Sequence, residues 1–116
     1  MNTEIAQGIQ DFVTFLQGQE NKNNVNNPTL AHNFYVGVLN RSTRFARIVK
    51  AGQTQQFVYA FVELATGLIF KPAGWKAPTL NFPRGTVLNR ASFTNAVVFG
   101  VYGIGGTRKE IILPKA

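Results

Sequence analysis

The chain has 116 residues, of which 45% are hydrophobic and 12% aromatic, and it contains no cysteine. This length and composition predict one globular domain, and the lack of cysteine excludes disulfides and thiolate chemistry. The formal net charge of +7 is uneven, because residues 1–40 hold three acids and one base whereas residues 41–116 hold eleven bases and two acids. A segment this basic is typical of proteins that bind nucleic acid, the commonest polyanion in a cell.

The N-terminal segment, residues 4–17, predicts an amphipathic helix. Its apolar side chains recur at helical spacing and form one stripe, which consists of Ile5, Ile9, Phe12, Val13 and Leu16. Gly18 is expected to end the helix, because glycine is the usual residue just past a helix C-terminus. We expect the stripe to pack on a sheet.

A polar connector is predicted over residues 18–28, where Asn, Gln, Lys and Glu leave almost nothing to bury. Pro28 is then expected to open a short second helix that reaches about Leu39. The run from Phe34 to Leu39 is also compatible with a strand, and the sequence leaves that alternative open. The single histidine, His32, is expected to be a surface or capping side chain.

The rest of the chain predicts an antiparallel sheet. Residues 45–50, 56–64 and 68–71 are rich in aromatic and β-branched side chains, and short connections at 51–54 and 65–67 join them as a meander. A second hairpin is expected from strands 96–102 and 109–113 across residues 103–106. The predicted fold is α+β, with the N-terminal helix packed on four or five antiparallel strands. We expect a single domain over residues 1–116, in which residues 29–116 form a basic, mainly-β body.

The loop over residues 70–85 contains three prolines, two glycines and the only tryptophan, Trp75. Lys71, Lys76 and Arg84 lie close to it in sequence. Cations beside an aromatic ring on a proline-stiffened loop can form a platform on which a base stacks while the cations meet phosphates. The alternative is that Trp75 plugs the edge of the sheet and the two lysines lie in water.

This loop also carries a resemblance to a known family. Residues 65–78 (ATGLIFKPAGWKAP), with RFARIV at 44–49 before them and Arg84-Gly85 after them, resemble small uncharacterised bacteriophage and environmental proteins that pair an ARIV strand with a KxAxWKAP…RG loop. This chain departs from the pattern at Pro72 and over residues 79–83, where a short basic stretch is replaced. The resemblance implies a phage origin and brings no activity with it.

The strand over residues 56–64 is predicted to have two distinct faces. Strand alternation places Phe57, Tyr59 and Phe61 on one face, and Val58, Ala60, Val62 and Leu64 on the other. If the aliphatic face is the core, the aromatic face, including Tyr59, is an open stacking platform. The favoured alternative is that the larger aromatic side chains form the core.

Two further groups of bases are candidates for phosphate contacts. Four bases recur at every third position: Arg41, Arg44, Arg47 and Lys50. We expect them at a sheet edge, where they either meet phosphates or protect an edge strand from aggregation. Arg108 and Lys109 follow a glycine-rich run and are expected at a flexible hairpin tip.

The function predicted from these features is non-catalytic, phage-encoded nucleic-acid binding with little sequence preference. Single-stranded DNA is favoured and RNA is the second choice. One histidine and five scattered acids offer few ways to build a catalytic or metal site, so no enzyme activity and no cofactor are expected. No segment predicts a membrane span, so we expect a cytoplasmic protein, in the host cytoplasm or packaged into a virion. The alternative is a structural or assembly protein, such as a minor virion component or a homo-oligomer subunit.

Overall fold

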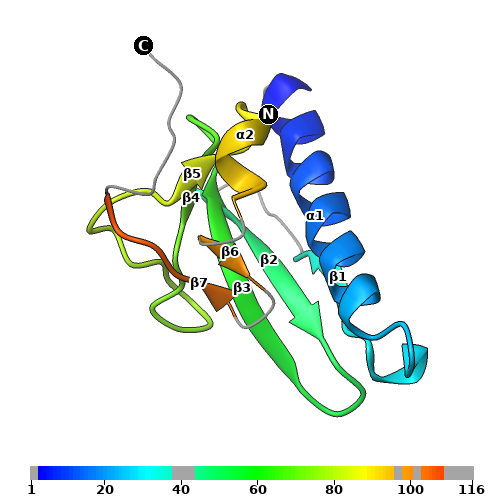
Figure 1. Ribbon diagram of the computed structural model, residues 1–116. Coiled ribbons are helices and arrows are strands. Elements are labelled where there is room, and N and C mark those ends of the chain that lie inside the picture. The colour runs from blue at the N-terminus through cyan, green and yellow to red at the C-terminus, as the bar shows by residue number, and fades with distance from the viewer. Residues whose placement is uncertain (1–2, 38–43, 96–97, 101–102, 109–116) are drawn as a thin grey trace.

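The computed structural model describes residues 3–37, 44–95, 98–100 and 103–108. One long helix lies against a five-stranded antiparallel sheet, which confirms the predicted α+β fold (Figure 1). The elements in chain order are α1 (Thr3–Asn23), the 3-10 helix η1 (Pro28–Leu30), β1 (Asn33–Val36), β2 (Phe45–Ala51), β3 (Gln56–Glu63), β4 (Leu68–Phe70), β5 (Gly85–Thr86), α2 (Arg90–Phe93), β6 (Phe99–Gly100) and β7 (Gly103–Ile104).

Helix α1 is longer than the sequence predicts. It continues through Gly18 to Asn23, so the prediction that the helix ends at Gly18 is wrong, and so is the first half of the connector over residues 18–28. Glycine inside a helix costs only about 1 kcal/mol relative to alanine. Burial of Glu20, which forms hydrogen bonds with the next segment, favours the extra turn over the glycine signal.

The segment after α1 contains a strand where the sequence favoured a helix. Helical structure is limited to the three residues of η1, and β1 then pairs antiparallel with β2, with Phe34 opposite Lys50. Phe34 is buried while Asn33 and Tyr35 are exposed, which is the alternation of a strand with one face on the core. The open alternative of a strand is therefore correct over the described residues.

The meander of β2, β3 and β4 confirms the predicted strands and both hairpin connections. The sheet order is β1-β2-β3-β4-β5, so β2 lies inside the sheet. The prediction that the bases of β2 occupy a sheet edge is therefore wrong.

A β-bulge changes which side chains of β3 share a face. Val58 pairs with Val49 and Ala60 pairs with Ile48, so Tyr59 is an extra residue between them. Tyr59 consequently joins Ala60 in the core under α1. The predicted alternation is wrong beyond this point, because Phe61 lies on the opposite face.

The main core lies between α1 and the sheet and is closed by α2 and β6. Phe12 is fully buried at its centre, with edge-to-face contacts to the rings of Tyr59, Phe93 and Phe99. The opposite face of the sheet carries a smaller aromatic cluster, in which the Phe45 ring contacts the rings of Phe61 and Phe70.

The C-terminal hairpin is tighter than the sequence predicts. Strand β6 pairs with β7, with Phe99 opposite Ile104. Gly103 and Ile104 are therefore strand residues, and the prediction that they belong to the connection is wrong. The predicted strand 109–113 lies outside the described residues.

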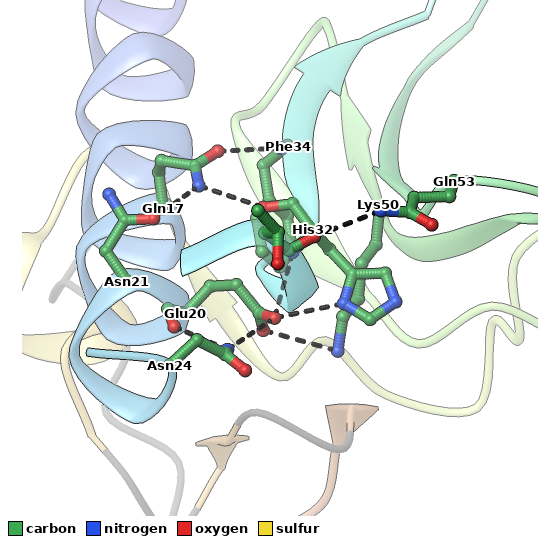
Figure 2. Close-up of polar contacts among 9 residues, drawn as sticks. Gln17, Glu20, Asn21, Asn24, His32, Phe34, Lys50 and Gln53 are labelled. Carbon is green, nitrogen blue, oxygen red and sulfur yellow. Dashed lines mark hydrogen bonds and ion pairs between the residues drawn. The ribbon is translucent and has the colours of Figure 1, made fainter. Parts of the chain in front are cut away.

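Side chains of α1 bind the outer edge of β1, which is the first strand of the sheet (Figure 2). The Gln17 amide donates to the His32 carbonyl at 2.9 Å and accepts from the Phe34 backbone N–H at 2.8 Å. The Glu20 carboxylate accepts from the His32 backbone N–H at 3.0 Å. Two side chains one helical turn apart thus satisfy three successive backbone groups at this edge.

Candidate functional site

A groove crosses the molecule where β3 begins and the loop after β4 passes beside it. It consists of two adjoining pockets of about 620 Å³ and about 300 Å³ that share Phe57, Val58 and Pro72. We call the two pockets together the Phe57 groove. The remaining lining residues of the larger pocket are His32, Lys50, Tyr59, Lys71, Gly103 and Ile104, and those of the smaller pocket are Gln56, Ala73, Gly74 and Trp75.

Two aromatic rings of the groove are open to solvent. Phe57 is 50% exposed and Trp75 is 44% exposed. Phe57 comes from the start of β3, on the helix side of the sheet, because it pairs with Lys50, which pairs with Phe34. Both residues line the smaller pocket, so together they form a candidate contact surface.

Trp75 lies at the tip of a turn that the loop forms over residues 71–79. The turn is closed by a bridge between Pro72 and Pro78 and by a 2.7 Å bond from the Thr79 N–H to the Lys71 carbonyl. Trp75 is therefore held in an ordered turn and is not buried, so the alternative that it plugs the sheet edge is wrong.

Arg47 of β2 fixes the tryptophan from the open face of the sheet. Its Nε donates to the Trp75 carbonyl at 2.8 Å, and its guanidinium carbon lies 4.7 Å from the Trp75 ring centroid. The same carbon is 6.0 Å from the centroid of Phe61. Stacking on the indole keeps a positive charge beside the ring and orients it.

The other end of the groove is polar. His32, Lys50 and Lys71 line it, and Glu20 of α1 holds the first two from behind (Figure 2). The Glu20 carboxylate lies 3.0 Å from His32 Nδ1 and 3.6 Å from Lys50 Nζ. It also accepts a 3.0 Å bond from the Asn24 amide.

Glu20 is ionised in spite of its burial. Only 4% of the residue is exposed, and burial alone would raise the pKa of its carboxyl. The hydrogen bonds from the His32 backbone and side chain, together with the charge of Lys50, outweigh this and hold the pKa below its usual value. The carboxylate is thus a fixed negative charge behind the side chains of His32 and Lys50.

No acid lines either pocket of the groove. The acids of the described residues lie on α1, as Glu4, Asp11 and Glu20, or on β3, as Glu63. Lys71 and Lys76, which flank the tryptophan turn, are exposed, and neither forms an ion pair within the described residues. The groove therefore combines open aromatic rings with a positive surface.

Three predicted site residues have structural roles. Arg44 donates to Glu63 at 2.7 and 2.9 Å, and with the Thr66 hydroxyl it helps hold the pKa of that carboxyl below its usual value. Tyr59 is 3% exposed and its hydroxyl donates to the Gly100 carbonyl at 2.7 Å, while burial raises the pKa of the hydroxyl. The prediction that Tyr59 stacks a base is therefore wrong. The side chain of Arg44 is 64% exposed, so its contact with phosphate stays a prediction.

The third is Arg84, which is only 6% exposed. Its guanidinium donates to the carbonyls of Gly105 and Gly106 and lies 4.0 Å from the Phe82 ring, and burial lowers its pKa. It links the start of β5 to the chain after β7, so the prediction of a phosphate contact here is wrong. Arg108 is exposed, its guanidinium carbon lies 5.2 Å from the Phe82 ring centroid, and it lines neither pocket of the groove.

From the predicted set, Lys50, Lys71 and Trp75 line the groove and Arg47 contacts Trp75, whereas Lys76 follows Trp75 in the chain but lines neither pocket. Arg41 and Lys109 lie outside the described residues. Sequence reasoning includes Phe57 only in a possible open aromatic face with Tyr59 and Phe61, and it misses the place of His32 in the groove. The polar neighbours of His32 did suggest a bonded role, but not its place in the groove.

Metal binding and membrane insertion find no support in the described part of the chain. It contains no group of three His, Asp or Glu side chains arranged to hold a metal ion. None of its helices has the length and apolarity that a membrane crossing requires.

Comparison with known proteins identifies a family without a known activity. No curated protein and no solved structure matches the chain. A family model described as "Family of unknown function (DUF7717)" matches residues 2–99, a range that includes α1, the whole five-stranded sheet and both rings of the groove. Because this range covers most of the sequence, the chain belongs to the DUF7717 family, which is uncharacterised.

Proposed function

We propose that this protein binds single-stranded nucleic acid, with DNA favoured over RNA, and that it does so without catalysis. The observation that carries the proposal is the Phe57 groove itself. Two half-exposed aromatic rings from distant parts of the chain line one groove that no acid lines. Open rings beside cations are the arrangement by which proteins bind single strands without reading their sequence.

Each part of the groove has a role in this proposal. Bases stack on Phe57 and Trp75, and each stacked base contributes about 1–3 kcal/mol. Lys71 and Lys76 meet the phosphates, and Arg47 keeps the Trp75 ring oriented. Duplex bases are already stacked on each other and hide their faces, so the groove selects single strands.

The setting that we propose is a bacteriophage infection, with the protein acting in the host cytoplasm. The support for this setting is the resemblance of residues 44–88 to small phage proteins. A protein of this size occupies only a short stretch of strand, so several copies would bind side by side.

The test uses Trp75 as its own reporter, because it is the only tryptophan in the chain. We expect oligothymidylate to quench its fluorescence as a base stacks on the ring. Anisotropy of labelled strands should show binding that weakens steeply between about 50 and 200 mM salt. Trp75→Ala should weaken binding by roughly 5- to 150-fold, the equivalent of about 1–3 kcal/mol.

Charge variants separate phosphate contacts from general attraction. Lys71→Gln should lower the slope of log K against log salt by about 0.7, as expected when one single-strand phosphate contact is lost. Arg90→Gln removes the same charge from an exposed position at the start of α2, at the opposite end of the sheet from the β2–β3 hairpin (Figure 1), and should leave the slope unchanged. If no nucleic acid binds at about 50 mM salt, the proposal is wrong and the assembly function takes its place.

A further inference from the structure

We propose that the larger pocket of the Phe57 groove binds one nucleotide through a terminal phosphate monoester. The ligand is either the phosphorylated end of a strand or a free nucleoside monophosphate, which present the same chemistry. This inference rests on the proposed function for the class of ligand. A pocket of this kind gives the groove a preference for a phosphorylated strand end, although the groove has no preference for sequence.

The larger pocket has the size and the walls of a small-molecule site. Its volume of about 620 Å³ lies within the range of about 300–1,000 Å³ that is usual for such sites. Five separate segments line it: the residue before β1 (His32), the end of β2 (Lys50), the start of β3 (Phe57–Tyr59), the loop after β4 (Lys71–Pro72) and β7 (Gly103–Ile104). The smaller pocket, at the Trp75 end, is lined only by β3 and the loop.

The lining divides into an apolar part and a polar part. Phe57 offers an exposed ring for a base, and Pro72 and Ile104 lie beside it in the same pocket. His32, Lys50 and Lys71 supply nitrogen donors. A nucleotide has a matching division, because its base has flat faces that stack on a ring and its phosphate is charged.

The donors suit a monoester better than a phosphate within a strand. Two lysines, one histidine and Glu20 behind them give this end of the pocket a net charge of +1 with neutral His32 and +2 with protonated His32. A phosphate monoester carries about −1.5 to −2 near neutral pH, whereas an internal phosphodiester carries −1. The monoester therefore gains more from the cluster.

Glu20 makes this end of the pocket a fixed wall. It accepts from both the backbone and the ring of His32 and lies 3.6 Å from Lys50 Nζ, so both side chains are anchored to α1 (Figure 2). The end of a strand that enters over Trp75 and passes Phe57 meets this wall. Glu20 acts on the ligand only through His32 and Lys50, so it is a positioning residue.

The experiment compares labelled oligothymidylate with a 5′-phosphate, with a 3′-phosphate and with neither, using the intact chain. We expect one of the two phosphorylated strands to bind about tenfold more tightly than the strand without a terminal phosphate, because the charged phosphate accepts additional hydrogen bonds. Thymidine 5′-monophosphate or 3′-monophosphate should displace the strand, whereas thymidine should not. Lys71→Gln should abolish the preference, while Trp75→Ala should weaken all three strands and keep it. Arg90→Gln is the matched control and should change neither property.

The outcomes distinguish this inference from the proposed function. Equal affinity for the three strands, with no displacement by either monophosphate, overturns the inference and leaves strand binding intact. Binding of a monophosphate without binding of any strand supports the nucleotide pocket and overturns the proposed function. Displacement by inorganic phosphate as strong as that by the nucleotide overturns the assignment of the base to Phe57.

Discussion

Two glycines of helix α1 provide a paired test of how the helix packs and where it ends. Gly8 is buried, and a Cβ added there would lie 2.4 Å from the Val87 carbonyl oxygen. Gly18 is exposed, and a Cβ there would meet nothing within 4 Å. The same substitution by alanine should therefore change stability in opposite directions at the two positions.

The magnitudes follow from helix propensity and from the contact at Val87. Alanine gains about 1 kcal/mol over glycine inside a helix, so Gly18→Ala should stabilise the protein by about that amount. At Gly8 the same gain applies, but real Cβ contacts stay above 3.0 Å, so the helix or the Val87 backbone must move by about 0.6 Å. Overpacking of this kind costs about 1–3 kcal/mol and cancels or exceeds the gain.

Urea and thermal unfolding, followed by far-ultraviolet circular dichroism, measure both variants against the wild type. We expect Gly18→Ala to unfold at a temperature about 4 °C above that of the wild type, and Gly8→Ala to unfold at or below the wild-type temperature, by up to about 8 °C. A stabilised Gly8→Ala would refute the close packing of α1 on Val87. A destabilised Gly18→Ala would show that the helix ends at Gly18, as the sequence alone predicts.

Three further predictions test the polar network, the bulge and a turn. The Glu20 pKa is lowered in the folded protein, so its contribution to stability is present above the unfolded value of about 4.3 and is lost as the pH falls through the folded value. The difference in unfolding free energy between wild type and Glu20→Gln should therefore shrink below about pH 4, and a difference that stays constant would contradict the network. Tyr59→Phe leaves the Gly100 carbonyl without its donor and should cost about 1 kcal/mol in urea unfolding, whereas no change would argue against the buried hydroxyl. Gly67 has a φ of +79° and little room for a Cβ beside Val87, so Gly67→Ala should lose about 1–3 kcal/mol by the same measurement, and an unchanged midpoint would exclude this turn geometry.

The spacing of apolar residues along the chain was enough to predict the helix and strands that bury one side of a regular element. The stripe from Ile5 to Leu16 is the buried face of α1, and the three strands of the meander lie within a residue or so of their predicted bounds. These patterns reflect burial on one side of a regular element, which the sequence records directly.

The errors arose where a distant contact decides the local structure. Gly18 favours the end of a helix, but the hydrogen bonds of Glu20 stabilise α1 beyond that glycine. The strand over Asn33–Val36 forms because β2 pairs with it. For the groove, the sequence left open whether Trp75 is exposed beside cations or plugs the sheet edge, and the structure shows it 44% exposed. The burial of Arg84 beside Phe82 could not be predicted from the sequence. It depends on where the fold places the carbonyls of Gly105 and Gly106, which accept hydrogen bonds from the guanidinium.

The contacts of Gln17 and Glu20 with β1 limit how copies of this protein can associate. An uncovered first strand would offer its backbone to the edge of another sheet, which is a common route to aggregation. Here a second chain would have to displace both side chains from His32 and Phe34 before it could add a strand at this edge. If copies gather on one nucleic-acid strand, as proposed above, they can therefore be crowded together without their sheets joining through β1.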